Sequence, residues 1–236
     1  MGDISGLEGL IANDLLDYFE PGGKFDNLVF LDVETTGFSC MQDRIIELAA
    51  IRVTSAGIQR QEDLYIRLPD GGCVPAKITG LTDITDEKLR LDGVSEEKAA
   101  GVLFEMIEGS TCIIAYNAEF DLSFIGMMFY RQMDAGHPEW MKQFGLCDYL
   151  DPMTIYKDRR AKPHKLKNAI KTYHLEDKVE NSHRAMDDVK ALFEVTKAMG
   201  RERDDLVEYK NIFGINPGLG LGGGRKFKKV KYIKQK

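Results

Sequence analysis

Short apolar runs along the chain predict the strands of a sheet. Residues 27–33 (NLVFLDV) have the length and the β-branched and aromatic composition of a buried strand. Residues 44–54 and 61–68 are predicted to be two further strands that form a meander with the first. A run rich in β-branched residues at 111–115 (TCIIA) predicts a fourth, shorter strand.

Apolar residues spaced three and four positions apart predict helices around these strands. Ser182 is a suitable N-cap for the last helix, and Gly200 is a suitable C-terminal stop. The sequence contains no internal repeat. The predicted helices span 7–20, 85–91, 95–108, 119–133, 164–173 and 183–200.

The last of these helices carries a carboxylate on its apolar face. Asp188 falls on the apolar stripe, whereas Asp187 lies outside it. A carboxylate on a buried stripe needs a partner, and a metal ion would supply one. His183 lies roughly one turn earlier, titrates near neutral pH and can accept a proton from water. The simpler alternative is a helix-terminal histidine that bonds to the backbone.

A pair of carboxylates lies at the end of the first strand. Because side chains alternate across a strand, Asp32 and Glu34 point to the same side. Two carboxylates on one side suit a hard cation that binds oxygen ligands. Thr35, Thr36 and Gly37 then turn the chain and offer hydroxyls and amides to a ligand. Taken alone, this pattern also fits a strand end with a solvated acidic rim.

A further carboxylate, Asp121, falls in the first turn of the helix predicted at 119–133, where the fourth strand ends. Ligands of α/β proteins bind at such strand ends. The alternative is ordinary helix chemistry, because an acidic residue in a first turn complements the helix macrodipole.

Together these residues form three motifs that resemble those of the DnaQ-like 3′–5′ exonucleases of the DEDDh type, including the proofreading-type exonucleases of bacterial DNA polymerase III. The first motif, Asp-x-Glu-Thr-x-Gly, stands at 32–37, the second at 117–121, and the third, His-x-Ala-x-x-Asp, at 183–188. The motif order and separations also match, over about residues 28–199. The histidine five residues before the last aspartate separates this type from a sister group that uses tyrosine nearby.

The resemblance implies an α/β fold of the ribonuclease H-like kind, with a mixed central sheet flanked by helices. The exonuclease domain would span 26–212, after a helical N-terminal extension at 1–25 and before a Gly-rich hinge and basic tail at 213–236. A last strand followed by a helix would occupy 146–156.

The resemblance also implies metal-dependent hydrolysis of a phosphodiester bond. Asp32, Glu34, Asp121 and Asp188 would bind two Mg²⁺ or Mn²⁺ ions, and His183 would take the proton of the attacking water. The product would be a nucleoside 5′-monophosphate released from the 3′ end. Without metal the four carboxylates would repel one another, and some of them should take up protons.

Substrate contacts follow from the same resemblance. Thr79, in the segment 77–82 (KITGLT), stands where family members often carry a histidine near the terminal nucleotide. This difference alters a nucleotide contact and leaves the metal ligands unchanged. The predicted substrate-binding residues are Thr35, Thr36, Gly37, Thr79, Asn117 and Phe120.

Charge is distributed unevenly along a chain whose net charge is −6. Residues 225–236 hold seven Lys or Arg and no acid, interleaved with Phe227 and Tyr232, a pattern that can neutralise phosphates and stack on bases. A solvated end, or a strand laid on an acidic neighbour, explains this tail equally well. The basic cluster at 159–171 (RRAKPHKLKNAIK) is a second candidate track for nucleic acid, with a solvated helix face as its alternative.

Composition is ordinary for a soluble protein, with 43% hydrophobic and 30% charged residues. Residues 1–236 fit one domain with appendages, and no apolar run approaches the ~20 residues of a membrane helix. The N-terminus lacks a signal-peptide pattern. The four cysteines form no Cys-x-x-Cys motif, which favours free thiols in the cytoplasm over a zinc site. They are Cys40, Cys73, Cys112 and Cys147.

Three functions compete. The favoured one is a 3′–5′ exonuclease on single-stranded or frayed DNA ends, partnered by a DNA polymerase or repair complex and without a membrane partner. The first alternative is an exoribonuclease on RNA 3′ ends, because nothing in the sequence identifies a reader of the 2′-hydroxyl. The second is a non-catalytic nucleic-acid-binding accessory of a polymerase. The five filled chemical positions argue against it.

Overall fold

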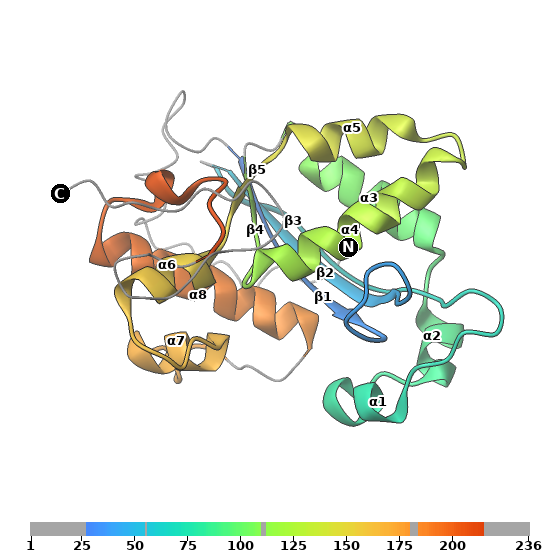
Figure 1. Ribbon diagram of the computed structural model, residues 1–236, viewed down its shortest axis with the longest axis horizontal. Coiled ribbons are helices and arrows are strands. Elements are labelled where there is room, and N and C mark those ends of the chain that lie inside the picture. The colour runs from blue at the N-terminus through green and yellow to red at the C-terminus, as the bar shows by residue number, and fades with distance from the viewer. Residues whose placement is uncertain (1–26, 55, 110–111, 180–183, 215–236) are drawn as a thin grey trace.

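Five strands form one mixed sheet, with helices on both of its faces (Figure 1). The computed structural model describes residues 27–54, 56–109, 112–179 and 184–214. The predicted helix at 7–20, the tail at 225–236, Ser182 and His183 lie outside the described residues. No helix within the described ranges is long and apolar enough to cross a membrane.

The sheet has the order β3-β2-β1-β4-β5 and combines antiparallel with parallel pairing. β1 pairs antiparallel with β2, which pairs antiparallel with β3, whereas β4 runs parallel to both β1 and β5. The mixed sheet predicted from the sequence is therefore confirmed. The strands are β1 (Asn27–Thr35), β2 (Ile45–Thr54), β3 (Gly57–Tyr65), β4 (Cys112–Ile114) and β5 (Asp148–Leu150).

The third strand begins earlier and ends earlier than the predicted span of 61–68. Gly57 has a φ of 98° and pairs directly with Thr54, so the hairpin turn is short and the strand starts at once. At the other end, β3 stops at Tyr65: the N–H of Ile66 still donates to the carbonyl oxygen of Ile46 at 3.0 Å, but Ile66 forms an isolated bridge with Val94.

The predicted helices within the described residues are confirmed, and two helices were not predicted. α1 is a single short helix, and α5 begins with Pro138 in its first turn and buries Trp140 and Phe144. The helices are α1 (Ala76–Thr82), α2 (Asp86–Asp92), α3 (Glu96–Ile107), α4 (Ala118–Met133), α5 (Pro138–Leu146), α6 (Pro152–Arg159), α7 (Leu166–Thr172) and α8 (Ala185–Glu202), followed by a 3₁₀ turn at Leu206–Tyr209.

Two hydrophobic cores lie on the two faces of the sheet, and β1 contributes alternate residues to each. Leu28 and Phe30 pack into the core beneath α6, α7 and α8. Val29 and Leu31 pack into the core beneath α3, α4 and α5, on the opposite side in Figure 1. Because the alternation continues along the strand, Asp32 and Glu34 lie on the α8 side, which confirms that they share a face.

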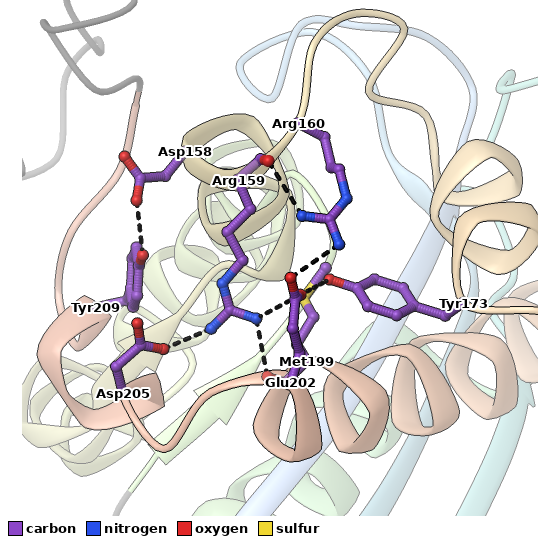
Figure 2. A network of polar contacts seen from close by, with 8 residues as sticks. All are labelled: Asp158, Arg159, Arg160, Tyr173, Met199, Glu202, Asp205 and Tyr209. Atoms are coloured by element: carbon purple, nitrogen blue, oxygen red, sulfur yellow. Dashed lines mark hydrogen bonds and ion pairs between the residues drawn. The ribbon is translucent and has the colours of Figure 1, made fainter.

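The C-terminal end of α8 is held by a polar network that also involves α6 and α7. Figure 2 shows Arg159 bonded to Asp205, Glu202 and the carbonyl oxygen of Met199, the last at 2.8 Å. Arg160 bonds to Glu202 at 2.8 Å, and the hydroxyl of Tyr173 donates to the same carboxylate at 2.6 Å.

This network corrects two interpretations of the sequence. The helix does not stop at Gly200 but continues to Glu202, whose contacts with Arg159 and Arg160 stabilise the last turn. The basic cluster at 159–171 begins with these same two arginines, and the Arg159 side chain is fully buried. Both arginines therefore form ion pairs with carboxylates of this domain, so we no longer count them among the residues that could bind nucleic acid.

Phe30 is the aromatic residue that joins the sheet to α8. It is fully buried, and its ring meets that of Phe193 edge to face with centroids 5.0 Å apart. The Phe30→Ala variant should lose about 3–5 kcal/mol of unfolding free energy, because it leaves a cavity between β1 and α8. Urea unfolding measures this loss. Tyr130→Ala, at a residue that is 57% exposed, is the control and should change it by less than about 0.5 kcal/mol. A loss below about 1 kcal/mol for Phe30→Ala would contradict the central place given to this contact.

Candidate active site

Three carboxylates from two distant segments meet at the end of β1. Asp32 and Glu34 project from the strand, and Asp188 projects from the first turn of α8, where it is 8% exposed. One carboxylate oxygen from each residue lies within 4.8 Å of those of the other two. Asp187, the adjacent acid, is less buried than Asp188, in line with the apolar stripe identified in the sequence.

Asp121 reaches the same strand from the start of α4. β4 pairs with β1 only from Leu28 to Phe30, and beyond that point the backbone N–H of Val33 donates to Asp121 Oδ1 at 3.2 Å. The Asp121 side chain is 2% exposed. Its carboxylate therefore lies against the backbone between Asp32 and Glu34, next to the group of three.

The electrostatics of this cluster favour protonated carboxyls. Burial, followed by the charges of Asp121 and Asp188, raises the pKa of Asp32 well above its usual range. Burial, followed by the charge of Asp188, raises the pKa of Glu34 to about 8. The pKa of Asp121 is also raised by burial, although backbone N–H groups oppose the shift. Like charges held together in a desolvated place take up protons unless a cation compensates them.

The donor set fits a divalent cation. All of its ligand atoms are carboxylate oxygens, which hard ions such as Mg²⁺ and Mn²⁺ prefer. A cation would also relieve the repulsion that raises the pKa values of Asp32 and Glu34.

The turn after β1 is shaped by its own polar groups. Thr35 Oγ1 donates to the carbonyl oxygen of Gly37 at 2.6 Å, and Thr36 Oγ1 donates to Asp43 Oδ1 at 3.1 Å. The N–H of Arg44 in turn donates to Thr36 Oγ1 at 3.0 Å. A Cβ at Gly37 would lie 2.5 Å from the Asp43 carboxylate, so a larger residue here would have to displace the side chain that holds the turn. The two hydroxyls that the sequence offered to a ligand are thus engaged within the turn.

The turn into α4 is held by a carboxylate that the sequence analysis missed. Asn117 has a left-handed φ of 66°, and its N–H donates to Asp151 Oδ1 at 2.9 Å. Asp151 is 4% exposed and also accepts from the Met153 N–H and the Thr154 hydroxyl at the start of α6. An aspartate immediately before a proline marks a helix N-cap, and this signal could have found it.

A second residue that the sequence analysis missed is Phe38. It follows the Gly37 turn directly and is 82% exposed. Its ring lies 6.4 Å from that of Phe120, which packs 4.9 Å from the ring of buried Phe124. An aromatic residue at the end of a turn motif was the available signal. The two rings form an aromatic ledge, Phe38 with Phe120, beside the first two motifs.

Thr79 comes from an element that carries none of the four carboxylates. It belongs to α1, which packs through Ile78 onto a small separate core that contains Ile46 and Ile84. Its backbone N–H and carbonyl serve the helix and its C-cap. The structure therefore brings together Asp32, Glu34, Asp121 and Asp188, and leaves Thr79 on a separate helix. His183 lies outside the described residues.

Comparisons with known proteins match this chain to exonucleases and to a DNA polymerase. An exonuclease family model, RNase_T, matches residues 29–196. The PolC-type DNA polymerase III of Clostridium perfringens is 30% identical over 221 residues, which cover 90% of this chain and 14% of that polymerase. Exonuclease I of E. coli in complex with a dA16 oligonucleotide superposes with a TM-score of 0.65 at 24% identity, over 78% of this chain and 42% of that one. A zinc-bound form of its complex with single-stranded DNA gives the same TM-score and the same coverage at 25% identity.

The fold and the acidic cluster define a nuclease domain of the ribonuclease H-like class. The chain belongs to the exonuclease family, and the DnaQ-like assignment made from its three motifs is confirmed. It spans about one seventh of the polymerase and about two fifths of the exonuclease I chain, so the likeness concerns only those parts of the two proteins.

The metal-free protein should lose stability as the pH rises. The folded protein holds a proton on Glu34 up to about pH 8, whereas the unfolded chain releases it near the ordinary pKa of 4.5. Between these values the folded state binds more protons, so the free energy of unfolding falls with rising pH. In EDTA, thermal unfolding should show a midpoint several degrees lower at about pH 8 than at about pH 5. Adding Mn²⁺ at the higher pH should restore it, because a cation replaces the protons.

Glu34→Gln is the matched control for this experiment, because it removes the titrating group and keeps its size. This variant should show a flatter dependence of the midpoint on pH in EDTA. A wild-type midpoint that stays level or rises over this range would contradict the raised pKa of the site.

Proposed function

We propose that this domain is a metal-dependent 3′–5′ exonuclease that releases nucleoside 5′-monophosphates from the 3′ end of single-stranded or frayed DNA. The observation that carries the proposal is the convergence of Asp32, Glu34 and Asp188 within 4.8 Å, with Asp121 against the same strand. Carboxylates gathered in this way, two of them half-buried and two buried, are costly unless a cation compensates them.

The four carboxylates would hold two Mg²⁺ or Mn²⁺ ions. Bound there, the ions would activate water and stabilise the charge that develops on the leaving 3′ oxygen. Asp32 and Glu34 stand two residues apart on a strand that pairs with β2 at both positions, which fixes their separation. The N–H of Val33 orients Asp121, and α8 brings Asp188 from the opposite side. The fold thus supports the ligands before any cation arrives.

We assign the proton transfer to His183. It precedes Arg184, the N-cap residue of α8, and stands five positions before Asp188 in the sequence. A neutral imidazole can accept the proton of the attacking water near pH 7, and the metal-binding carboxylates do not have to provide this function.

The aromatic ledge formed by Phe38 and Phe120 would hold the terminal bases of a single strand. Every base presents a π-face, so stacking on exposed rings binds strands of any sequence. The ring of Phe124, which is buried, packs against Phe120 and keeps the aromatic ledge in place. Asn117, at the exposed turn before α4, and the Thr35–Gly37 turn would border the same strand.

The similar proteins favour DNA over RNA as the substrate. One relative is named as a DNA polymerase III, and the exonuclease I structures contain deoxyoligonucleotides or single-stranded DNA. We propose the same polymer for this domain, with a DNA polymerase or repair complex as partner. Cys40, Cys73 and Cys147 are free thiols, which is consistent with a reducing compartment such as the cytoplasm.

The decisive assay uses single-stranded DNA and RNA of one sequence, each labelled at its 5′ end, with Mg²⁺, Mn²⁺ or EDTA. We expect a ladder that shortens from the 3′ end of DNA, requires metal, and is slower on RNA. Asp32→Ala should reduce the rate about a thousandfold, because it removes a ligand worth several kcal/mol in the transition state.

Glu202→Gln, at the far end of α8, is the control variant and should retain the activity. Faster cleavage of RNA would replace DNA by RNA as the substrate. Hydrolysis in EDTA would overturn the metal-dependent mechanism, and cleavage from the 5′ end would overturn the polarity.

A second prediction concerns the aromatic ledge. Phe38→Ala should raise KM for a single-stranded oligonucleotide about 5- to 150-fold, corresponding to the ~1–3 kcal/mol of one stacked base, and leave kcat within about threefold. Steady-state kinetics on a fluorescent oligonucleotide measure both values. Leu146→Ala, at a 71% exposed leucine of α5, should change neither. An unchanged KM for Phe38→Ala would remove the ledge from the substrate path.

A further inference from the structure

Glu47 is a fully buried carboxylate beside the acidic cluster, and the three motifs do not contain it. It lies on β2 directly opposite Glu34 in the ladder with β1. Cross-strand partners share a face, and Ala49 and Ile51, further along β2, pack into the core beneath α8. The Glu47 side chain therefore points toward α8, on the same side as Asp32 and Glu34.

Both oxygens of Glu47 are engaged at the start of α8. Oε1 accepts from Arg184 Nη2 at 3.1 Å and from Arg184 Nε at 3.3 Å. Oε2 accepts from the backbone N–H of Ala185 at 3.2 Å. Arg184 also donates to the hydroxyl of Tyr65, which pairs with Glu47 on the neighbouring strand β3. Two strands of the sheet thus hold one arginine.

These contacts fix the first turn of the helix that carries Asp188. Ala185 is the first residue of α8, and its N–H is one of those that a helix leaves without an internal partner. The N-cap residue, Arg184, supplies no side-chain cap. Glu47 performs that task from the sheet. The N–H of Asp188 bonds to the carbonyl oxygen of Arg184, so Asp188 is attached to the same anchor.

A direct role for Glu47 as a metal ligand fits these contacts less well. Its two oxygens already accept charge-assisted or backbone hydrogen bonds from Arg184 and Ala185. The group of carboxylates that could hold a cation contains Asp32, Glu34 and Asp188. A buried charge next to that group adds repulsion, so a neutral residue would pack there at lower cost. The hydrogen bonds of Glu47 to Arg184 and Ala185 offset this repulsion.

We propose that Glu47 is a positioning residue of the nuclease site. It ties the start of α8 to β2 and so sets the place of the Asp188 carboxylate relative to Asp32 and Glu34. This inference rests on the proposed function, in which these carboxylates bind the divalent ions.

The test is Glu47→Gln, which keeps the size of the side chain and loses its charge and one acceptor oxygen. Calorimetric titration with Mn²⁺, without substrate, should show an affinity about 10- to 100-fold weaker than that of the wild type. This is the range seen when residues that orient metal ligands are changed. On the oligonucleotide substrate kcat should fall in parallel, whereas KM should stay within about twofold.

Glu62→Gln is the matched control. Glu62 stands on β3 opposite Ala50, on the face that packs against α3–α5, so the same chemical change falls on the other side of the sheet. This variant should bind Mn²⁺ as the wild type does. Arg184→Gln should reproduce the Glu47→Gln defect, and the double variant should lose little more than either single variant, because both changes break one interaction.

Arg184→Lys keeps the positive charge but loses the contact that Arg184 makes through two nitrogen atoms. If the Glu47→Gln protein does not fold, Arg184→Lys tests the same interaction. It should lose Mn²⁺ affinity by a smaller factor than Arg184→Gln. Folded Glu47→Gln or Arg184→Lys with wild-type Mn²⁺ affinity would overturn the positioning role and leave the proposed function intact. A wild type that neither binds Mn²⁺ nor cleaves would overturn the proposed function, and this inference with it.

Discussion

Repulsion among buried carboxylates at the end of β1 is the constraint that the rest of this domain has to satisfy. Asp32, Glu34, Asp121, Asp188 and Glu47 bring five acidic groups into one region, and the charges of the other four each raise the pKa of Asp32. The surrounding framework resists their separation. β1 is paired along its length with β2, and α8 is pinned to β1 by the Phe30–Phe193 contact and to β2 by Glu47 and Arg184.

Two glutamates show how differently the fold treats the same side chain. At the far end of α8, burial opposes ionisation of Glu202, but hydrogen bonds from Tyr173 and Arg160 outweigh it and lower the pKa of Glu202 to about 2. At the end of β1, the pKa of Glu34 is about 8, because burial and the charge of Asp188 outweigh the opposing charge of Arg184. Hydrogen bonds within the protein stabilise the ionised form of Glu202. Glu34 lacks such compensation, and a cation would supply it.

The sequence predicted what depends on local periodicity and missed what depends on pairing across the fold. The alternation along β1 and the stripe on α8 were enough to place Asp32, Glu34 and Asp188 on facing surfaces. Glu47 could not be recognised, because its partner Arg184 is 137 residues away and its strand is otherwise an ordinary buried one. The roles of Arg159 and Arg160 within the basic cluster at 159–171 were hidden for the same reason, since the carboxylates that pair with them lie more than 40 residues further along the chain.

The topology explains why the motifs meet and where a strand can approach them. β1 and β4 are parallel, so the segments that follow them, the Thr35–Gly37 turn and the start of α4, leave the sheet at the same edge. α8 covers one face of β1 and brings Asp188 to the strand end. Exposed Phe38 lies on the turn side, next to Phe120 at the start of α4. In the proposed function, a 3′ end that crosses these rings would enter a site lined from two sides, with Asp32 and Glu34 on the strand and Asp188 on the helix.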